Sequence, residues 1–234
     1  SAGEKAAWLN WLDEYRMHDR VFIIAEAGVN HNGSMETARE MIDAAAQAGA
    51  DAVKFQTFTA RDLVRQDAPK ARYQQQSGPQ GESQFSMIKK LELDAEAHRD
   101  LIAHCLKRNI LFLSSPFDLP SIDLLCNLEI PLFKIPSGEI TNLPYLRKIG
   151  RLNKEIILST GMAELAEIAA ALEALRQAGA TQTITLLHCN TEYPTPFADA
   201  NLRAINTLAA AFNCPVGYSD HTLGIEACIA AVAL

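Results

Sequence analysis

Several features that mark other protein classes are missing from this sequence. No apolar run reaches the roughly 18 residues that cross a bilayer, so no membrane span is expected. The first residues lack the charged, apolar and small-residue order of a signal peptide, so none is expected. Basic residues are few, 21 against 28 acidic ones, and the net charge is −7. Because binding along a nucleic-acid backbone needs a basic surface, no nucleic acid is expected among the partners.

Paired cysteines are missing too. The five cysteines are odd in number and include no Cys-x-x-Cys spacing, so a zinc cluster is not expected. Three of them, Cys105, Cys126 and Cys228, lie in apolar stretches with helical spacing, and we expect them to be small core residues. Free core cysteines are typical of a reducing compartment, so the predicted location is cytoplasmic.

The sequence does contain seven short apolar runs, each of which ends abruptly in polar residues. Continuous apolar runs of this length favour strands buried on both faces, as in a parallel sheet covered by helices. Polar residues at the C-terminal ends of such strands are typical of the active site of a (β/α)8, or TIM, barrel. The runs are 21–25, 52–53, 110–113, 132–133, 156–158, 184–187 and 215–218.

The remaining segments fit one α/β domain over residues 1–234. The chain is slightly shorter than the about 250 residues of a usual TIM barrel, and 48% of its residues are hydrophobic. Ser34 is a predicted helix N-cap. The stretch 57–95 is long and polar, which is typical of a functional or irregular loop. Helices are predicted at 4–16, 35–48, 95–108, 119–127, 142–150, 162–178, 199–211 and 225–234.

The strand count is one short of a closed barrel. Seven strands are predicted, and the apolar sequence that ends at Leu234 contains no helix stop signal. We therefore expect a barrel truncated before its eighth strand.

Two lysines, Lys54 and Lys134, each close an apolar strand. Lysine is rarely buried without a partner, and two ammonium groups at one barrel mouth would form a strong anion site. The alternative is that each lysine pairs with a neighbouring carboxylate for structural reasons. Hydroxyl and backbone N–H donors in turns near helix N-termini add to the anion prediction, at Ser115, Ser137 and Ser159. Together these residues favour a phosphorylated or carboxylated substrate.

Two carboxylates at strand ends, Glu26 and Glu139, are the candidate acid–base groups. The alternative is that each is the ion-pair partner of a lysine. Gln56, Asn190 and Tyr193 are neutral polar residues suited to a substrate that carries hydroxyl groups. Turn polarity or core packing would explain each of these three equally well.

One histidine, His221, stands at the end of the seventh predicted strand, next to Asp220. It is a candidate metal ligand with Asp220 as its orienting neighbour, or else a hydrogen-bonded structural residue. His188 is expected to be a hydrogen-bonded interior residue. The histidines of the predicted helix 95–108 are expected at its surface or in its packing, and they are His98 and His104.

Seven motifs, in order and covering almost the whole chain after residue 20, resemble those of the sialic acid synthase family. They are IAEAGVNHNGS (24–34), VKFQT (53–57), SPFD (115–118), KIPSGE (134–139), LSTGM (158–162), HCNTEYPTP (188–196) and GYSDHT (217–222). The resemblance implies a TIM barrel that condenses phosphoenolpyruvate with an open-chain N-acetylated hexose, N-acetylmannosamine. The implied products are a nine-carbon 2-keto acid, N-acetylneuraminate, and phosphate.

The resemblance also implies a divalent cofactor, Mn²⁺ or Mg²⁺, and a homodimer for the full-length protein. It implies that phosphoenolpyruvate is held by Lys54, Lys134, Ser137 and Ser159, with Ser115 and Asn190 or Thr191 nearby. The residues that would contact the sugar are Glu26, Gln56 and Tyr193. Glu139 would handle water or protons at C2 of phosphoenolpyruvate, and His221 would be one of two metal-ligating histidines.

Two parts of the family pattern are expected to be absent from residues 1–234. The second metal histidine would lie on an eighth strand beyond Leu234, and the small C-terminal antifreeze-like domain would follow it. We therefore expect residues 1–234 alone to bind manganese weakly and to turn over little or not at all.

Three alternatives remain open. The segment 217–226 resembles N,N′-diacetyllegionaminate synthases and 190–196 resembles bacterial N-acetylneuraminate enzymes, so a legionaminate or pseudaminate synthase with the same chemistry is possible. An aldolase of another class would use Lys54 or Lys134 in a Schiff base. A non-catalytic polysaccharide-assembly protein could share the barrel, although the presence of both lysines and both glutamates argues against it.

Overall fold

The protein is described by a computed structural model that covers residues 20–66, 68 and 83–234. The chain forms two compact units, and the boundary lies between Ile130 and Pro131. The helix predicted at 4–16 lies outside the described residues, as does most of the middle of the stretch 57–95. The organisation of residues 1–234 as a single barrel domain stays a prediction.

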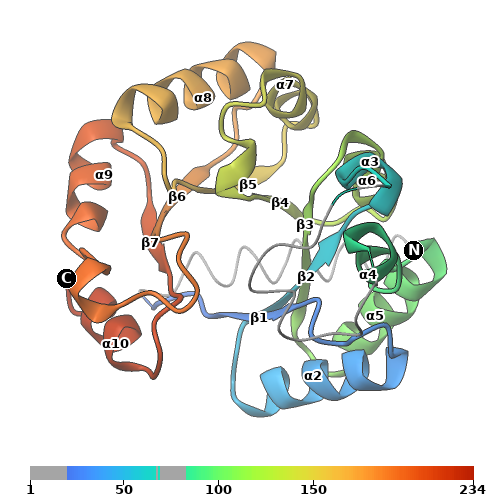
Figure 1. Ribbon diagram of the computed structural model, residues 1–234. Helices are drawn as coiled ribbons and strands as arrows, with labels where there is room; N and C mark the ends of the chain where they lie inside the picture. The colour runs from blue at the N-terminus through green and yellow to red at the C-terminus, as the bar shows by residue number, and fades with distance from the viewer. Residues whose placement is uncertain (1–19, 67, 69–82) are drawn as a thin grey trace. The chain divides into compact units, whose positions relative to one another are not determined.

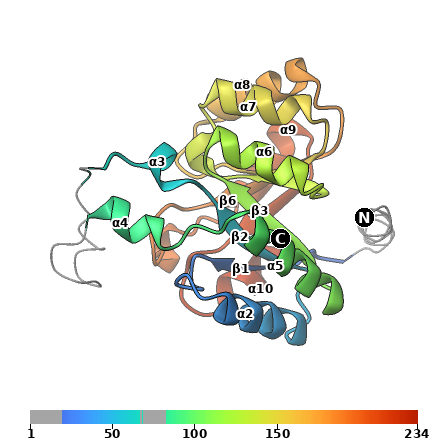
Figure 2. The same cartoon turned by 90° about the vertical axis from the view of Figure 1, so that its right-hand side faces the viewer.

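The first unit contains a three-stranded parallel sheet with β2 in the centre. Helices α2 and α5 lie side by side, with α2 against β1 and β2 and α5 against β3, and α6 also packs on β3 (Figures 1 and 2). The elements are β1 (Ile24–Gly28), α2 (Met35–Gln47), β2 (Ala52–Thr57), α3 (Ala60–Leu63), α4 (Gln84–Lys89), α5 (Ala95–Lys107), β3 (Leu111–Pro116) and α6 (Leu119–Asn127). The short helices α3 and α4 lie within the stretch that was predicted as a loop.

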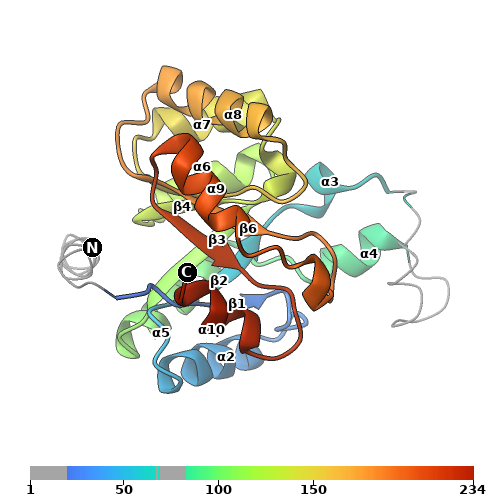
Figure 3. The ribbon, with the colours of Figure 1, turned by 90° about the vertical axis from the view of Figure 1, so that its left-hand side faces the viewer.

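The second unit contains a four-stranded parallel sheet in the order β4-β5-β6-β7. Helices α7 and α8 pack side by side, while α9 packs on β6 and β7 (Figures 1 and 3). The elements are β4 (Leu132–Ile135), α7 (Leu143–Arg151), β5 (Glu155–Ser159), α8 (Leu165–Ala178), β6 (Ile184–Cys189), α9 (Ala204–Phe212), β7 (Val216–Ser219) and α10 (Glu226–Val232). Two 3-10 turns, η2 (Ser137–Glu139) and η3 (Phe197–Asp199), follow β4 and β6.

Local capping explains where several helices begin. Ser34 is the N-cap of α2, as predicted, and its Oγ accepts from the backbone N–H of Thr37 at 3.2 Å. Helix α8 begins at Leu165 instead of the predicted 162, because Glu164 and Glu167 form a capping box at that point. Helix α9 begins later than the predicted 199, because 197–199 form a separate 3-10 turn.

The first strand also differs from the prediction. The apolar run 21–25 was predicted as the strand, but β1 starts at Ile24 and continues through the polar motif to Gly28. Val21 and Ile23 are each about half exposed. The run leads into the sheet through Asp51, whose carboxylate accepts from the backbone N–H of Ile23 at 2.8 Å and from Arg20 at 2.6 Å.

The cysteine prediction holds only in part. Cys105 is buried in the core of the first unit and Cys126 is half-buried, but Cys228 is exposed. On helix α10 only Ala227 is buried, so its apolar sequence does not form a buried face within the second unit. Among the described residues, no helix combines the length and the apolar character needed to cross a membrane.

Candidate active site

The strand ends of the first unit gather four predicted site residues on one face of the sheet. Glu26 lies opposite Lys54 across β1 and β2, and Gln56 lies opposite Ser115 across β2 and β3. Opposite residues in neighbouring parallel strands project from the same face, and so do residues two apart in one strand. The carboxylate of Glu26 forms an ion pair with the ammonium of Lys54. The pairing that the sequence left open for these two residues is therefore present.

The four residues differ in burial. The side chain of Lys54 is 13% exposed and that of Glu26 is 51% exposed, whereas Ser115 is buried. A Cβ placed on Gly28 would lie 3.1 Å from Glu26 Oε1 and 3.8 Å from Gln56 Nε2. The carboxylate and the amide therefore border the same small space next to Gly28, where a hydroxyl-bearing molecule could meet both.

In the second unit, Lys134 is buried at the end of β4. Its ammonium donates to Ser159 Oγ at 2.6 Å and to the carbonyl oxygen of Ile135 at 3.2 Å. Lys134 lies opposite Ile157 of β5, so Ser159, two residues further along, projects from the same face. A buried cation next to a hydroxyl at adjacent strand ends is suited to holding an anion.

Three more side chains of the second unit converge on Gly161. A Cβ on this residue would lie 2.8 Å from Thr191 Cγ2, 2.9 Å from Cys189 Sγ and 3.2 Å from Ser137 Oγ. Ser137 begins η2 after β4, and Thr191 follows β6, so residues that are far apart in the sequence meet here. The absence of a side chain at Gly161 is what allows this close approach.

Glu139 lies in η2, two residues after Ser137. Its Oε2 accepts from Asn142 Nδ2 at 2.7 Å, and Asn142 in turn caps helix α7 by accepting from the N–H of Tyr145. The carboxylate is therefore held at the start of α7 by a neutral amide.

His221 is oriented by a backbone carbonyl. Its Nδ1 lies 2.6 Å from the carbonyl oxygen of Asn190, which can only accept, so Nδ1 carries a proton and donates. The exposed ring of Tyr193 packs against the imidazole, with 4.4 Å between ring centroids. The Asn190 side chain donates from Nδ2 to the carbonyl oxygen of Asp199 at 2.8 Å. Asn190, Tyr193 and His221 thus form one cluster.

Asp220 holds the turn that presents His221. Its carboxylate accepts from the backbone N–H and the hydroxyl of Thr222, from the Tyr218 hydroxyl and from the Cys228 thiol. Burial opposes ionisation of Asp220, but these hydrogen bonds outweigh it and lower its pKa. Burial, followed by the Asp220 carboxylate, raises the pKa of the Tyr218 hydroxyl. None of these Asp220 hydrogen bonds involves the His221 side chain, so Asp220 acts on His221 by fixing the turn that carries it.

His221 fits one position of a metal site. With Nδ1 bonded to a carbonyl, Nε2 is the nitrogen that can ligate a metal, which is the usual arrangement for a metal-bound histidine. Within 20–66, 68 and 83–234, no group of three or more histidine, cysteine or acidic side chains is placed to hold a metal ion. The described residues therefore offer a single ligand and not a complete site.

The sequence did not identify two residues that hold the strand ends of the first unit. Asp118 accepts from the backbone N–H of Thr59 and of Ser121, both at 2.7 Å. His98 is fully buried and bonds the hydroxyl of Thr57 at 2.8 Å. The signal for His98 was its spacing from Leu101 on the buried face of α5. His188 bonds the carbonyl oxygen of Ala200 as predicted, but it is half-buried instead of interior. His104 bonds Asp43 at the surface, as predicted.

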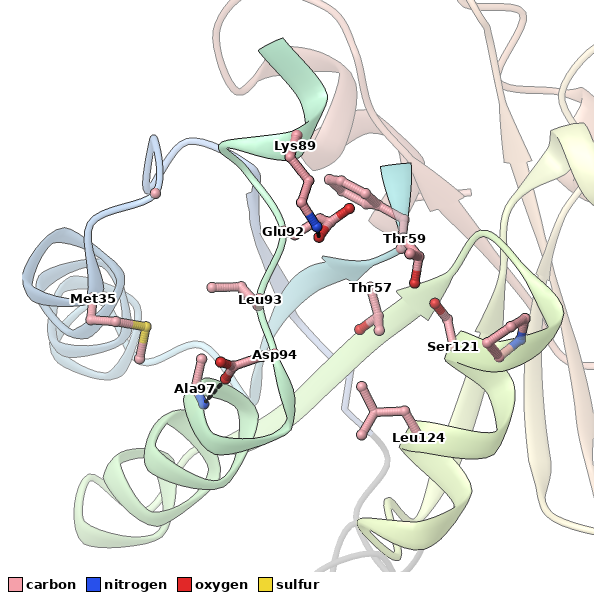
Figure 4. A pocket seen from close by; sticks show the side chains of 13 residues that line it. Met35, Thr57, Thr59, Lys89, Glu92, Leu93, Asp94, Ala97, Ser121 and Leu124 are labelled. Carbon is pink, nitrogen blue, oxygen red and sulfur yellow. Dashed lines mark hydrogen bonds and ion pairs between the residues drawn. The ribbon is translucent and has the colours of Figure 1, made fainter. Parts of the chain in front are cut away.

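The first unit also contains a cavity of about 640 Å³ beside the end of β2. Figure 4 shows the side chains of Thr57, Thr59 and Ser121 grouped on one side of it, with the Lys89–Glu92 ion pair at another wall. Thr57 projects from the face of the sheet opposite to Lys54 and Gln56. The cavity therefore lies behind the strand ends that carry the candidate site.

The sequence and the fold of the chain are matched by known proteins. The model of the NeuB family matches residues 41–234. The chain belongs to the NeuB family. Across 92% of this chain it is 58% identical to an N,N′-diacetyllegionaminic acid synthase of Campylobacter jejuni, and across 87% it is 47% identical to one of Legionella pneumophila. The chain spans 65% and 58% of the lengths of these two NeuB relatives.

A solved structure supports the fold class. One similar structure is the N-acetylneuraminic acid synthetase of Leptospira borgpetersenii, determined in complex with citrate. The match covers 92% of this chain and 70% of the Leptospira chain. The TM-score is 0.78 and the sequence identity is 36%. Solved NeuB-type synthases have TIM-barrel-like folds, so the predicted fold class is confirmed. Relatives are named as synthases of N,N′-diacetyllegionaminic acid, of N-acetylneuraminate 9-phosphate and of pseudaminic acid, so the substrate of this chain is left to be proposed.

Proposed function

We propose that this NeuB-family protein condenses phosphoenolpyruvate with an open-chain N-acetylated amino sugar and water, to give a nine-carbon 2-keto acid and phosphate. The observation that carries the proposal is the buried ammonium of Lys134 bonded to Ser159 at adjacent strand ends. Buried lysine is uncommon, and a fixed cation beside hydroxyls suits a substrate with phosphate and carboxylate groups. Membership of a family of such synthases supports the same reaction.

The proposed anion-binding residues of the second unit are Lys134, Ser159, Ser137 and Thr191. Lys134 would compensate the charge of the phosphate or carboxylate, while the hydroxyls would donate to its oxygens. Gly161 keeps Ser137 and Thr191 in place by leaving room for both. In the first unit, Lys54 is proposed as a second cation for the same substrate, next to the buried hydroxyl of Ser115.

The proposed reaction balances as follows. C3 of phosphoenolpyruvate attacks the aldehyde carbon of the sugar, a C–C bond forms, and the former aldehyde oxygen takes up a proton. Water adds to the electron-poor C2 and gives up a proton, for which Glu139 is the proposed acceptor. The hydroxyl on the resulting tetrahedral C2 loses its proton to the departing phosphate and becomes the keto C=O, while the bond from C2 to the phosphate oxygen breaks and phosphate leaves with the electron pair. Orientation of the two substrates contributes because the reacting carbons must meet.

The proposed contacts to the sugar are Glu26 and Gln56 of the first unit and Tyr193 and Asn190 of the second. Glu26 and Gln56 border one space next to Gly28, and a carboxylate and an amide there can accept from and donate to hydroxyl groups. Tyr193 is exposed and packs on the proposed metal ligand His221, which supports the proposal that it contacts the sugar.

We also propose a divalent metal, Mn²⁺ or Mg²⁺, with His221 as one of its ligands. When bound, such an ion would polarise the sugar aldehyde as a Lewis acid. His221 supports this proposal because Nδ1 is already occupied by the Asn190 carbonyl and Nε2 is the remaining nitrogen. As the family resemblance implies, a second histidine is proposed as a further ligand of the same metal. A homodimer and a cytoplasmic location are proposed as well.

For the sugar, we propose the substrate that leads to N,N′-diacetyllegionaminate. The Campylobacter and Legionella relatives, which are 58% and 47% identical to this chain, are N,N′-diacetyllegionaminic acid synthases and favour this substrate. Removing the three carbons of pyruvate from this nine-carbon product leaves a six-carbon sugar with two acetamido groups. N-acetylmannosamine, which would give N-acetylneuraminate, is the second candidate and is favoured by the Leptospira enzyme.

Phosphate release tests the proposal. The complete protein would be incubated with phosphoenolpyruvate, manganese and either a diacetamido-trideoxyhexose or N-acetylmannosamine, and the phosphate formed would be measured. We expect release that depends on the sugar and is faster with the diacetamido sugar. Absence of release with every N-acetylated hexose would contradict the synthase and favour a non-catalytic role. Borohydride trapping of a keto substrate on Lys54 or Lys134 would instead indicate a Schiff-base aldolase, and we expect no adduct.

A further inference from the structure

A chain of buried hydrogen bonds lies behind the candidate site in the first unit. Ser114 Oγ lies 2.6 Å from Thr57 Oγ1, which lies 2.8 Å from His98 Nε2. The other ring nitrogen, His98 Nδ1, lies 2.8 Å from the carbonyl oxygen of Asp94. All three side chains in this chain are at most 1% exposed. This series of hydrogen bonds joins β3, β2 and α5.

The direction of each hydrogen bond follows from the groups involved. A carbonyl oxygen can only accept, so His98 Nδ1 carries the proton and donates to Asp94. Burial lowers the pKa of His98, which keeps the imidazole neutral, so its Nε2 accepts from the Thr57 hydroxyl. The oxygen of Thr57 is then free to accept from the Ser114 hydroxyl. Each hydroxyl donates to one defined acceptor, so rotation of either hydroxyl breaks a hydrogen bond of the series.

The chain contacts the strands directly behind the candidate substrate residues. Thr57 follows Gln56 in β2, and Ser114 precedes Ser115 in β3. Gln56 and Ser115 lie opposite each other in the sheet. Because side chains alternate between faces, the hydrogen bonds fix the backbone from one face while Gln56 and Ser115 project from the other.

The next residues of the same segment are also fixed. Asp118 accepts from the N–H of Thr59 at 2.7 Å, and Glu92 accepts from the N–H of Ala60 at 2.5 Å. These two contacts hold the backbone beyond the strand. They do not reach the side chain of Thr57, so His98 alone among these three groups acts at the residue adjacent to Gln56.

We propose that His98 is a positioning residue, which acts through Thr57 and Ser114 to place Gln56 and Ser115 for substrate binding. This inference rests on the proposed function. Its specific content is that breaking the chain raises the KM for the amino sugar more than it lowers kcat, because Gln56 is displaced while the anion-binding residues of the second unit are unchanged. A small displacement of a binding group can cost about tenfold or more in KM.

The test compares two substitutions of one residue with a matched control. Thr57→Val keeps the shape of the side chain and removes the hydroxyl, whereas Thr57→Ser keeps the hydroxyl. Thr59→Val makes the same change two residues further on, where the hydroxyl does not belong to the chain. Phosphate release would be measured with the complete protein at varied sugar and varied phosphoenolpyruvate. We expect Thr57→Val to raise the KM for the sugar about tenfold with little change in kcat, and both other variants to match the wild type.

The outcomes separate the two proposals. A wild-type protein that releases no phosphate overturns the proposed function, and this inference with it. An active wild type with an unchanged sugar KM in Thr57→Val overturns the inference alone, as does a loss of thermal stability or of active fraction without a change in KM. If Thr57→Val does not fold, Ser114→Ala removes only the outer hydrogen bond. It should then raise the same KM by a smaller factor, and an unchanged value there overturns the inference too.

Discussion

The two strand-end lysines stand in the same sequence context but in different surroundings. Lys54 ends an apolar run in the first unit and forms an ion pair with Glu26, whose side chain is half exposed. Lys134 ends an apolar run in the second unit, is buried, and donates to a hydroxyl and a carbonyl. The neighbouring strand makes the difference, because β1 supplies a carboxylate opposite Lys54 and β5 supplies Ser159 near Lys134.

This difference indicates a division of work between the units. The carboxylate of Glu26 partly cancels the field of the Lys54 ammonium, and Lys134 is the more deeply buried of the two lysines, where a charge acts more strongly on a bound anion. The second unit is therefore expected to contribute more to the binding of phosphoenolpyruvate. The first unit is expected to contribute more to orienting the sugar.

The largest effect is expected for Lys134→Ala. Removing this cation should reduce phosphate release by about 10²- to 10³-fold, because a preorganised charge at the reacting group is lost. Steady-state phosphate release by the complete protein checks this. Arg147→Ala, which removes an exposed cation from helix α7 of the same unit, is the control and should leave the rate unchanged. A near-normal rate for Lys134→Ala would refute its proposed role and the division between the units.

A smaller and coupled effect is expected at the other lysine. Lys54→Met should reduce phosphate release by about 10²-fold, and Glu26→Gln should also reduce it. Because the two side chains are in contact, the double variant should lose less than the sum of the single losses, with a coupling of about 0.5–3 kcal/mol in transition-state free energy. Rates of the four proteins of the cycle give this value. Lys107→Ala, an exposed lysine of α5, is the control, and strict additivity would show that the pair does not act together.

A pair of glycines tests how tightly the second unit is packed at its strand ends. Gly161→Ala would place a Cβ within 3 Å of Thr191 and Cys189, so neighbouring groups must move. We expect a loss of about 1–3 kcal/mol in the free energy of unfolding and a higher KM for phosphoenolpyruvate. Gly138→Ala is the matched control, because nothing lies within 4 Å of its added Cβ. Equal behaviour of the two variants in denaturant unfolding would contradict the close packing around Gly161.

The smallest effect is expected for the stability contributed by Asp43, an exposed carboxylate of the first unit. Its surroundings contrast with those of the half-buried Glu26–Lys54 pair. The hydrogen bond from His104, followed by the charge of Arg108, holds the pKa of Asp43 below its ordinary value of 3.8. Because the pKa of Asp43 is lower in the folded state than in the unfolded state, its carboxylate stabilises the fold at pH values above the unfolded-state pKa. This stabilisation is lost as the pH falls through the folded-state pKa.

The stability difference between the wild type and Asp43→Asn should therefore be present at neutral pH and shrink in acid below the ordinary pKa. Denaturant unfolding at several pH values measures it, with Glu40→Gln on the same helix as the control. A difference that stays constant across this range would show that the hydrogen bond from His104 is not responsible.

Much of the fold was predictable because its signals are local. The helix after Ser34 and the helix before Arg108 lie where the caps and apolar spacing predicted them, whereas β2 begins at the predicted Ala52 but continues through Lys54 to Thr57. The predicted start of β1 was wrong, because Val21 and Ile23 are about half exposed and the N–H of Ile23 donates to the Asp51 carboxylate instead of to a neighbouring strand. The prediction that Cys228 is a core residue was also wrong, because only Ala227 of helix α10 is buried.

The candidate site was predictable as a set of residues but not as a set of contacts. The motifs identified Lys54, Glu26 and His221, yet the sequence left open whether Glu26 paired with a lysine. It also assigned His98 only to the surface or the packing of its helix. The partners of these residues are far away in the sequence, as Thr57 is from His98, and no local pattern reveals such a pairing.

The sequence by itself determined the alternation of strands and helices, the residues at each strand end and the resemblance to one family. These follow from hydrophobic periodicity, capping and short motifs, all of which act over neighbouring residues. The tertiary structure alone decided that Lys54 is paired with a carboxylate and Lys134 with a hydroxyl, and that His98 bonds the strand behind Gln56. Strand register sets these contacts, because it determines which distant side chains share a face of the sheet.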